Sequence, residues 1–206
     1  MRVTQIVELS KSRSKIFIEQ EFAFVLYKGE LRLYHVREGE ELAEEDYNTI
    51  MQEVLPKRTK LRAMNLLKNR EYTTAQLRMK LKQGFYPDGI IEEALSYVAS
   101  FHYTDDCRYA RDFIYYNAEK KSRKRIEQDL LSKGISKEIM ETVWAEWQES
   151  GGEQDEQAMI LQLLKKKQYQ PSRADYKEQQ KIYAFLMRKG FSGEQIRKAM
   201  GTDIFE

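Results

Sequence analysis

Five cationic side chains lie within six consecutive positions near the middle of this 206-residue chain, and they form its densest group of potentially functional residues. They are Lys120, Lys121, Arg123, Lys124 and Arg125. Cations at this density can neutralise the phosphates of a nucleic acid, and Tyr115, Tyr116 and Tyr169 are available to stack on its bases. The other interpretation is a solvated helix end that happens to be basic. The sequence leaves both interpretations open.

Two shorter basic segments lie on either side of this cluster. They contribute Lys57, Arg58, Lys60 and Arg62, and Lys165, Lys166 and Lys167. Residues 56–133 hold 17 Lys and Arg against 10 Asp and Glu, whereas the counts are 7 against 11 in residues 1–55 and 11 against 12 in residues 134–206. A basic middle between acidic ends favours a polyanionic partner, including direct contact with DNA.

The residue types of a catalytic centre are scarce. His35 and His102 have no other His or Cys near them at ligand spacing, so we expect no zinc site and no other metal site. No glycine-rich stretch carries the Lys-Ser/Thr pair of a phosphate-binding loop. Cys107 follows two aspartates, which disfavour a reactive thiolate. The sequence therefore predicts a protein that is not an enzyme, with no catalytic residue, no cofactor and no small-molecule substrate.

The compartment and assembly are also matters of expectation. No apolar run approaches the roughly 18 residues of a membrane span, and the first residues lack the apolar segment of a secretory signal. The single cysteine cannot form an internal disulfide and fits a reducing compartment. We expect a soluble, cytoplasmic monomer that does not contact a membrane.

The elements that position the basic residues are indicated by a phrase that occurs three times. It reads "LKQGFYPDGIIEEAL" at residues 81–95, "LLSKGISKEIMETVW" at 130–144 and "LMRKGFSGEQIRKAM" at 186–200. Each phrase has a Leu, a Gly three or four residues later, and an apolar pair beginning thirteen residues after the Leu. This spacing predicts a helix, a tight turn and a second helix. Gly84, Gly134 and Gly190 are the expected left-handed turn residues, and Asp88, Ser136 and Ser192 the expected N-caps.

A further helical stretch precedes each phrase, which makes the unit three helices long. One such unit cannot bury its own apolar face, so neighbouring units must stack. The expected fold is mainly α-helical, with three tandem three-helix repeats forming an elongated solenoid. We expect a first repeat region at residues 40–102, a second repeat at 103–151 and a third at 152–206.

The first forty residues are different in character. Residues 3–9, 15–19, 21–27 and 31–36 are rich in Val, Ile, Phe and Tyr and partly alternate apolar with polar side chains, as half-buried strands do. The "KGE" at residues 28–30 places a glycine where a hairpin turn needs one. We therefore expect a small antiparallel β unit of three or four strands at residues 1–39, packed on the helices that follow.

The helical part resembles a known family. "AMNLLKNREYTTAQLRMKLKQGF" (residues 63–85) is similar to the first repeat of the RecX regulatory proteins, and "YTDDCRYARDFI" (103–114) is similar to the start of their second. "RIEQDLLSKGIS" (125–136) and "FLMRKGFSGEQIRKAM" (185–200) resemble the later glycine turns. The resemblance covers residues 60–200, approximately, in the family's order.

The resemblance implies a regulator of the RecA recombinase in DNA repair, recombination and the SOS response. Such a protein binds the RecA–DNA filament and restrains its ATPase, strand exchange and coprotease activities. The family has no sharp contact motif, so the basic clusters are assigned from charge alone. Two alternatives stay open: a helical-repeat DNA-binding protein that acts without RecA, and an adaptor for an unrelated protein.

Overall fold

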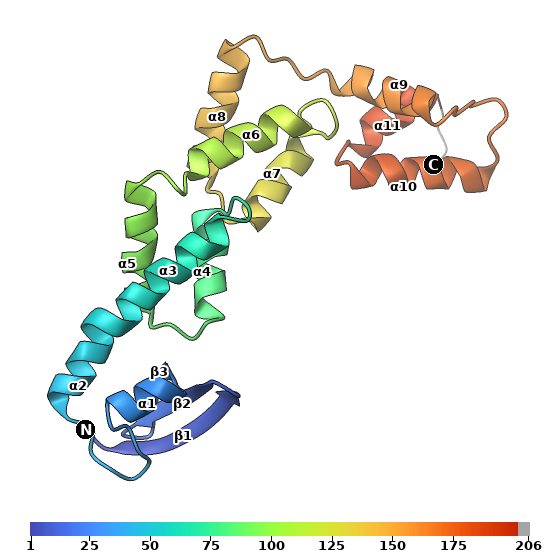
Figure 1. The fold of residues 1–206 in the computed structure, drawn as a ribbon. Coiled ribbons are helices and arrows are strands. Elements are labelled where there is room, and N and C mark those ends of the chain that lie inside the picture. Colours follow the sequence, from blue (N-terminus) through green and yellow to red (C-terminus); the bar gives the residue numbers. More distant parts are fainter. Residues whose placement is uncertain (202–206) are drawn as a thin grey trace. The chain divides into compact units, whose positions relative to one another are not determined.

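The computed structural model describes residues 1–201, so the last five positions of the expected third repeat lie outside the described residues. The chain divides into two compact units, Met1–Asp105 and Asp106–Glu206. The first contains a three-stranded sheet and one three-helix repeat, and the second contains two three-helix repeats (Figure 1). The expected mainly helical fold with an N-terminal antiparallel unit is therefore confirmed.

The sheet of the first unit is an antiparallel meander of β1 (Val3–Ser10), β2 (Arg13–Ile18) and β3 (Glu21–Tyr27). Along β2, Ser14, Ile16 and Ile18 are buried while the residues between them are partly exposed, so one face of the sheet covers a core. Glu19 and Gln20 both have positive φ, which is the backbone of a two-residue type I′ hairpin turn.

The expected fourth strand is wrong, because this segment is helical: α1 spans Lys28–Leu33. The predicted "KGE" hairpin turn is wrong for the same reason. Leu31 and Tyr34 pack against the core beneath the sheet, whereas Leu33 is 67% exposed. That is the i, i+3 spacing of a helix, since a strand would place Leu31 and Leu33 on one face. The Glu30 carboxylate accepts a hydrogen bond from the Tyr27 backbone at 2.7 Å and so caps the helix start.

A long helix connects the sheet to the first repeat. It comprises α2 (Glu44–Thr49), a π-helical turn (Ile50–Val54) and α3 (Leu55–Leu67), and it continues through Pro56 (Figure 1). A proline removes one N–H from the helix and clashes with the preceding turn. The wider π turn lies directly before Pro56, where Leu55 donates its N–H to the Ile50 carbonyl five residues back. This local change of winding accommodates the proline without ending the helix.

The first repeat consists of α3, α4 (Thr74–Lys82) and α5 (Asp88–Ser100). The second has α6 (Asp106–Asn117), α7 (Arg123–Ser132) and α8 (Lys137–Glu149), and the third has α9 (Glu156–Lys166), α10 (Tyr176–Arg188) and α11 (Gly193–Met200). Each repeat has its own cluster of buried apolar side chains. The apolar residues of the repeated phrase, such as Leu81, Leu130 and Leu186, are fully buried in these clusters.

The turn glycines are where the repeats differ. Gly134 and Gly190 have φ of 81° and 91°, which confirms them as left-handed turn residues. The expectation for Gly84 is wrong, because Phe85 takes the left-handed position with φ of 63°. The reason is spacing: the left-handed residue is the fourth after the buried Leu in every repeat, and Gly84 is only the third after Leu81.

The N-caps follow the same pattern of two agreements and one difference. Ser136 accepts a hydrogen bond from the Ile139 backbone, and Ser192 forms a capping box with Gln195, as expected. The N-cap of α5 is Pro87, so the assignment of Asp88 is wrong. Asp88 is instead the first helical residue, where its negative charge still favours the positive end of the helix dipole.

Candidate functional site

The five-residue basic cluster occupies the turn between α6 and α7 and the first turn of α7. Its chain path is fixed by Ser122, which is fully buried and accepts a hydrogen bond from the Arg125 backbone as the N-cap of α7. Lys120, Arg123, Lys124 and Arg125 are exposed, whereas Lys121 is partly buried.

Most of these cations already have a partner within the second repeat. Lys121 and Arg125 share the Asp129 carboxylate, at 2.8 Å and 3.0 Å, and Arg123 pairs with Glu127 at 2.8 Å. Two further contacts are to aromatic rings: Arg123 lies 4.9 Å from the centroid of Trp144, and the Lys120 ammonium lies 3.2 Å from that of Tyr116. In the part of the chain that the structure describes, Lys124 has no ion pair. The cluster is therefore less available to a partner than five free charges.

The third repeat brings additional lysines to the same place. The Ser122 N–H donates to the Lys189 carbonyl at 3.1 Å, and the Lys189 ammonium donates to the Lys120 carbonyl at 3.1 Å. Burial lowers the pKa of Lys189, and the positive charges of Lys121 and Lys166 lower it further. Cations from the ends of α9 and α10 thus gather beside the α6–α7 turn.

An aromatic ring belongs to this group. The ammonium groups of Lys167 and Lys189 lie 5.1 Å and 5.5 Å from the centroid of Phe185. We name the assembled set the junction lysines: Lys120, Lys121, Lys166, Lys167 and Lys189. They come from three separate segments of the chain, and only the packing of the third repeat on the second brings them together.

The contact between these two repeats is specific. A Cβ added to Gly190 would lie 2.4 Å from the Ser122 hydroxyl and 2.5 Å from the Arg125 Cβ, so no other residue fits this approach. The Glu156 carboxylate accepts hydrogen bonds from the Arg123 backbone and from the Gln195 amide, both at 3.0 Å.

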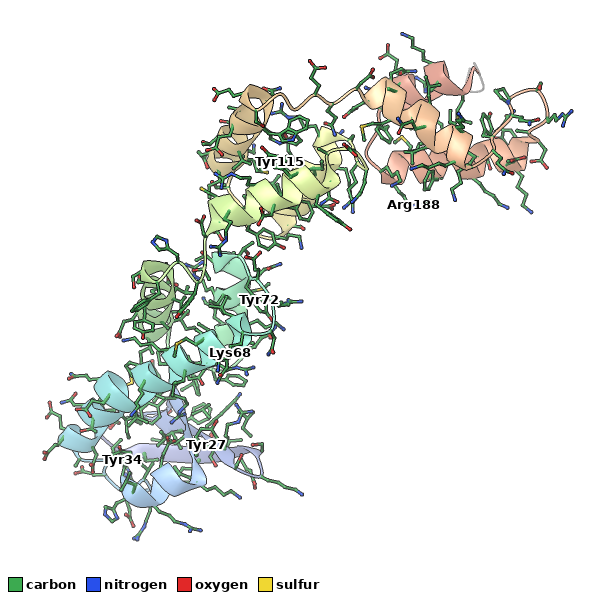
Figure 2. All side chains as sticks on the ribbon, turned by 45° about the horizontal axis from the view of Figure 1, so that its top comes forward. Tyr27, Tyr34, Lys68, Tyr72, Tyr115 and Arg188 are labelled. Carbon is green, nitrogen blue, oxygen red and sulfur yellow. The ribbon has the colours of Figure 1, made fainter. Side chains whose placement is uncertain are left out.

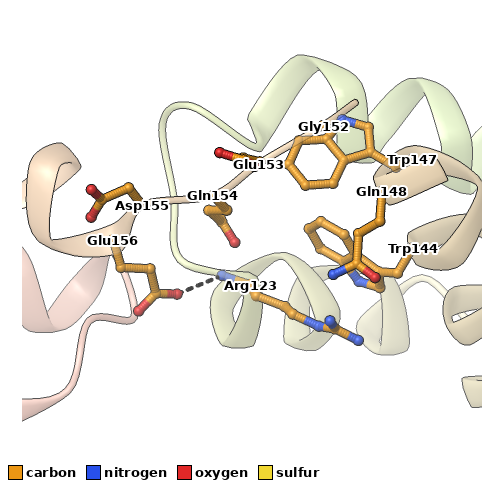
Figure 3. Close-up of a pocket in the computed structure, with 9 residues that line it drawn as sticks. All are labelled: Arg123, Trp144, Trp147, Gln148, Gly152, Glu153, Gln154, Asp155 and Glu156. Atoms are coloured by element: carbon orange, nitrogen blue, oxygen red, sulfur yellow. Dashed lines mark hydrogen bonds between the residues drawn. The ribbon is translucent and has the colours of Figure 1, made fainter. Parts of the chain in front are cut away.

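The linker between α8 and α9 strengthens the same contact. The Gln154 amide donates to the carbonyls of Ala118 and Lys121 at 2.7 Å. Gly152 lies so close to Trp147 that a Cβ there would come within 2.4 Å of the indole. Figure 3 shows Gly152 and Gln154 among the residues that line a pocket of about 450 Å³, with the two Trp rings opposite Glu156 and the Arg123 backbone. The linker is therefore an ordered part of the junction.

The cations of the secondary basic patches differ in how far they are buried and paired. Arg58 is mostly buried: it pairs with Glu30, donates to the Val25 carbonyl at 3.0 Å and lies over the Tyr27 ring, so it fastens the sheet to α3. Lys60 pairs with Glu93 at 2.6 Å. The other members of these patches are exposed: Lys57, Arg62, Lys165, Lys166 and Lys167.

The three tyrosines proposed for base stacking also differ in exposure. Tyr115 and Tyr116 are exposed, at 52% and 71%, but Lys120 already lies over the Tyr116 ring and the Tyr115 hydroxyl is hydrogen-bonded to Ser150 at 2.9 Å; Tyr115 is labelled in Figure 2. The expectation for Tyr169 is wrong, because its ring is 8% exposed and belongs to the core of the third repeat.

Lys189 and Phe185 are the site residues that the sequence did not single out. Lys189 is the C-cap of α10, where the negative end of the helix dipole favours a cation, so its charge alone indicates no further role. The sequence of α10 does not indicate that its C-terminal end packs against the α6–α7 turn.

The described residues offer no candidate for two other kinds of site. Residues 1–201 contain no group of three or more His, Cys, Asp or Glu side chains that could hold a metal ion. Among the same residues, no helix combines the length and the apolar character that crossing a membrane requires.

Comparison with known proteins agrees with the three-repeat architecture. The models of the first, second and third three-helix domains of RecX match residues 60–97, 105–143 and 153–200. A crystal structure of a regulatory protein RecX shares the fold, with a TM-score of 0.58 at 20% identity over 98% of this chain and 99% of that one.

Curated relatives carry the same name. The regulatory protein RecX of Caldanaerobacter subterraneus subsp. tengcongensis is 31% identical over 202 residues, which are 97% of this chain and 98% of that protein. Regulatory protein RecX of Listeria monocytogenes is 26% identical over 98% of this chain and 76% of its own length. The chain therefore belongs to the RecX family of regulatory proteins.

Proposed function

We propose that this protein binds the RecA filament on DNA and restrains it, lowering its ATPase, strand exchange and coprotease activities. The proposal starts from the family, which is regulatory rather than enzymatic, and from the RecA regulators that the sequence resembles. In this proposal the protein acts as a monomer in the cytoplasm, on DNA to which RecA is already bound.

The junction lysines are the observation that supports the proposal best. Their positive charges are concentrated enough that Lys121 and Lys166 act on the pKa of Lys189. Lys121 is balanced in part by Asp129, but in the described chain Lys166, Lys167 and Lys189 have no carboxylate partner. Bringing like charges together costs free energy that a bound polyanion offsets. The phosphates of the filament's DNA are the polyanion that we assign to this surface.

This binding mode accounts for the restraint. A protein bound to the DNA phosphates inside the filament forms contacts that must break before RecA subunits can rearrange or before new subunits can join the filament end. ATP hydrolysis, strand exchange and coprotease action all depend on the assembled filament, so one obstruction lowers all three.

A binding experiment with three partners tests the proposal. Fluorescence anisotropy would measure binding to a labelled single strand alone and to the same strand coated with RecA, and labelled protein would report binding to RecA without DNA. We expect the coated strand to bind at least about tenfold more tightly than either component, because it combines phosphate and protein contacts. Affinity should fall steeply with salt.

The two alternative functions give different results in the same experiment. Equal affinity for bare and RecA-coated strands would identify a DNA-binding protein that acts without RecA. Binding to neither strand would favour an adaptor for another protein.

A further inference from the structure

The first unit contains a second basic site, separate from the junction lysines. A pocket of about 490 Å³ lies where β2 and β3 meet the first repeat. Three cations line it, one from each of β2, α3 and α4, together with three tyrosines: Arg13, Arg62, Lys80, Tyr27, Tyr72 and Tyr86. Its size is within the few hundred Å³ that small-ligand pockets usually have.

The charges of this pocket are not balanced. None of the nine lining residues is acidic. Within residues 1–201, Arg13, Arg62 and Lys80 form no ion pair, and Lys80 has only a long hydrogen bond of 3.4 Å to the Gln83 amide oxygen. The Glu30 carboxylate is already held by Arg58 and by the Tyr27 backbone. An anion is therefore the missing counter-charge.

The tyrosines give the pocket its aromatic wall. Arg13 and Tyr27 are cross-strand partners in the sheet, and Tyr72 is only 9% exposed, with Arg70 over its ring at 4.3 Å (Tyr27 and Tyr72 are labelled in Figure 2). Tyr86 is held against the turn after α4, where a Cβ on Gly84 would lie 2.7 Å from its ring. Burial raises the pKa of Tyr86, against the lowering effect of Arg58, Arg62 and Arg13, so its hydroxyl remains a hydrogen-bond donor at neutral pH.

We propose that this pocket binds the phosphate of a nucleotide, with its base or sugar against the tyrosine rings. Two guanidinium groups and an ammonium can donate several hydrogen bonds to the oxygens of a phosphate and neutralise its negative charge. Phenol rings provide the flat apolar contact that a nucleobase prefers. The nucleotide can be part of a single strand or free in solution, since both offer the same phosphate and base.

Binding to the full-length protein, without RecA, tests this site independently of the proposed function. The probes are a fluorescein-labelled dT5 strand, ADP and inorganic phosphate, measured by fluorescence anisotropy or calorimetry at low salt. The test variant is Arg13→Gln/Arg62→Gln/Lys80→Gln. The control variant, Lys11→Gln/Arg32→Gln/Lys68→Gln, removes the same charge from exposed positions of the same unit. A third variant, Gln83→Trp, fills the pocket and keeps every cation.

We expect the test variant and Gln83→Trp to weaken binding at least tenfold, and the control to change it by less than twofold. Loss confined to dT5 would identify a strand as the source of the nucleotide, and loss confined to ADP would identify a free nucleotide. Equal loss in the control, or wild-type binding in the test variant, would overturn the proposal. So would the absence of binding by every probe.

The melting temperature of the unliganded protein distinguishes a binding role from a structural one. Removing three unpaired like charges relieves repulsion, so the test variant should melt no lower than the wild type. Phosphate or ADP should raise the melting temperature of the wild type and not that of the test variant. A test variant that melts well below the control would show that these cations stabilise the fold, which would contradict the proposal.

Discussion

At the scale of single residues, cations of the same type have different roles that only their surroundings reveal. Arg58 fastens the sheet to α3, Arg123 and Arg125 each pair with an acidic residue four positions later on α7, and Lys189 contacts the Lys120 carbonyl near two other lysines. The i, i+4 pairs on α7 are readable in the sequence, because both partners lie on one helix. The position of Lys189 is not readable, since it depends on how two repeats pack.

The first prediction concerns the junction lysines. The variant Lys166→Gln/Lys189→Gln should bind the RecA filament at least about tenfold more weakly, and its log–log salt slope should be shallower by about 1.4, the value for two lost contacts on a single strand. Neither ammonium forms an ion pair in the described chain, so helical content measured by circular dichroism should not change.

Lys137→Gln/Arg173→Gln is the matched control, because it removes two exposed charges from the same unit. It should bind like the wild type. If the test variant keeps the affinity and the salt slope of the wild type, Lys166 and Lys189 are exposed to solvent and do not contact the filament.

The second prediction compares two glycines with the same backbone and different neighbours. Gly190 and Gly151 have φ of 91° and 85°, but an added Cβ meets Ser122 and Arg125 at Gly190 and nothing within 4 Å at Gly151. Alanine at either site should cost about 1–2 kcal/mol of unfolding free energy for the left-handed backbone. Gly190→Ala should cost about 1–3 kcal/mol more, from overpacking.

Urea unfolding of the two glycine variants checks this difference. Equal destabilisation would mean that the third repeat is not held closely against the second at Gly190.

At the scale of elements, the sequence was most reliable where one helix end contains its own signal. Ser136 and Ser192 are N-caps, and Gly134 and Gly190 are left-handed, as their spacing indicates. Two errors have different causes. Tertiary packing decides the segment after β3, which forms α1 because Leu31 and Tyr34 reach the core together. Spacing decides the turn after α4, where Phe85 takes the left-handed position because Gly84 is one residue too close to Leu81.

The third prediction concerns the element that connects the second and third repeats. Glu156→Ala removes a carboxylate that accepts hydrogen bonds from the first residue of α7 and from the capping box of α11. It should cost about 1–2 kcal/mol of unfolding free energy. Amide hydrogen exchange in α9 and α11 should become faster. Glu153→Ala removes the same charge from an exposed position three residues earlier and should change neither quantity. If both variants behave alike, net charge rather than the bridge is responsible.

At the scale of the whole molecule, the repeated phrase predicted the number of repeats and their helical content, because burial of the same Leu and Ile positions is what the repeats have in common. The sequence singled out four of the junction lysines, but it could not predict that they lie together with Lys189, nor the pocket beside the sheet. Both sites combine residues that are far apart in the chain, such as Lys120 with Lys189 and Arg13 with Lys80.

The fourth prediction concerns the contribution of the third repeat. A chain ending at Gly151 keeps Lys120 and Lys121 but loses Lys166, Lys167 and Lys189. It should remain largely helical by circular dichroism, with lower solubility because a terminal repeat has been removed. It should bind the RecA filament at least about tenfold more weakly. If the truncated protein inhibits RecA to the same extent as the full chain, the third repeat only caps the stack of repeats and does not contribute to binding.

The most direct test of the account is the rate of ATP hydrolysis by RecA on single-stranded DNA, measured with increasing amounts of this protein. We predict that substoichiometric wild-type protein lowers the rate and that Lys137→Gln/Arg173→Gln lowers it equally. Lys166→Gln/Lys189→Gln should need at least about ten times more protein for the same effect. An unchanged rate at equimolar wild-type protein would contradict the claim that this chain restrains the RecA filament.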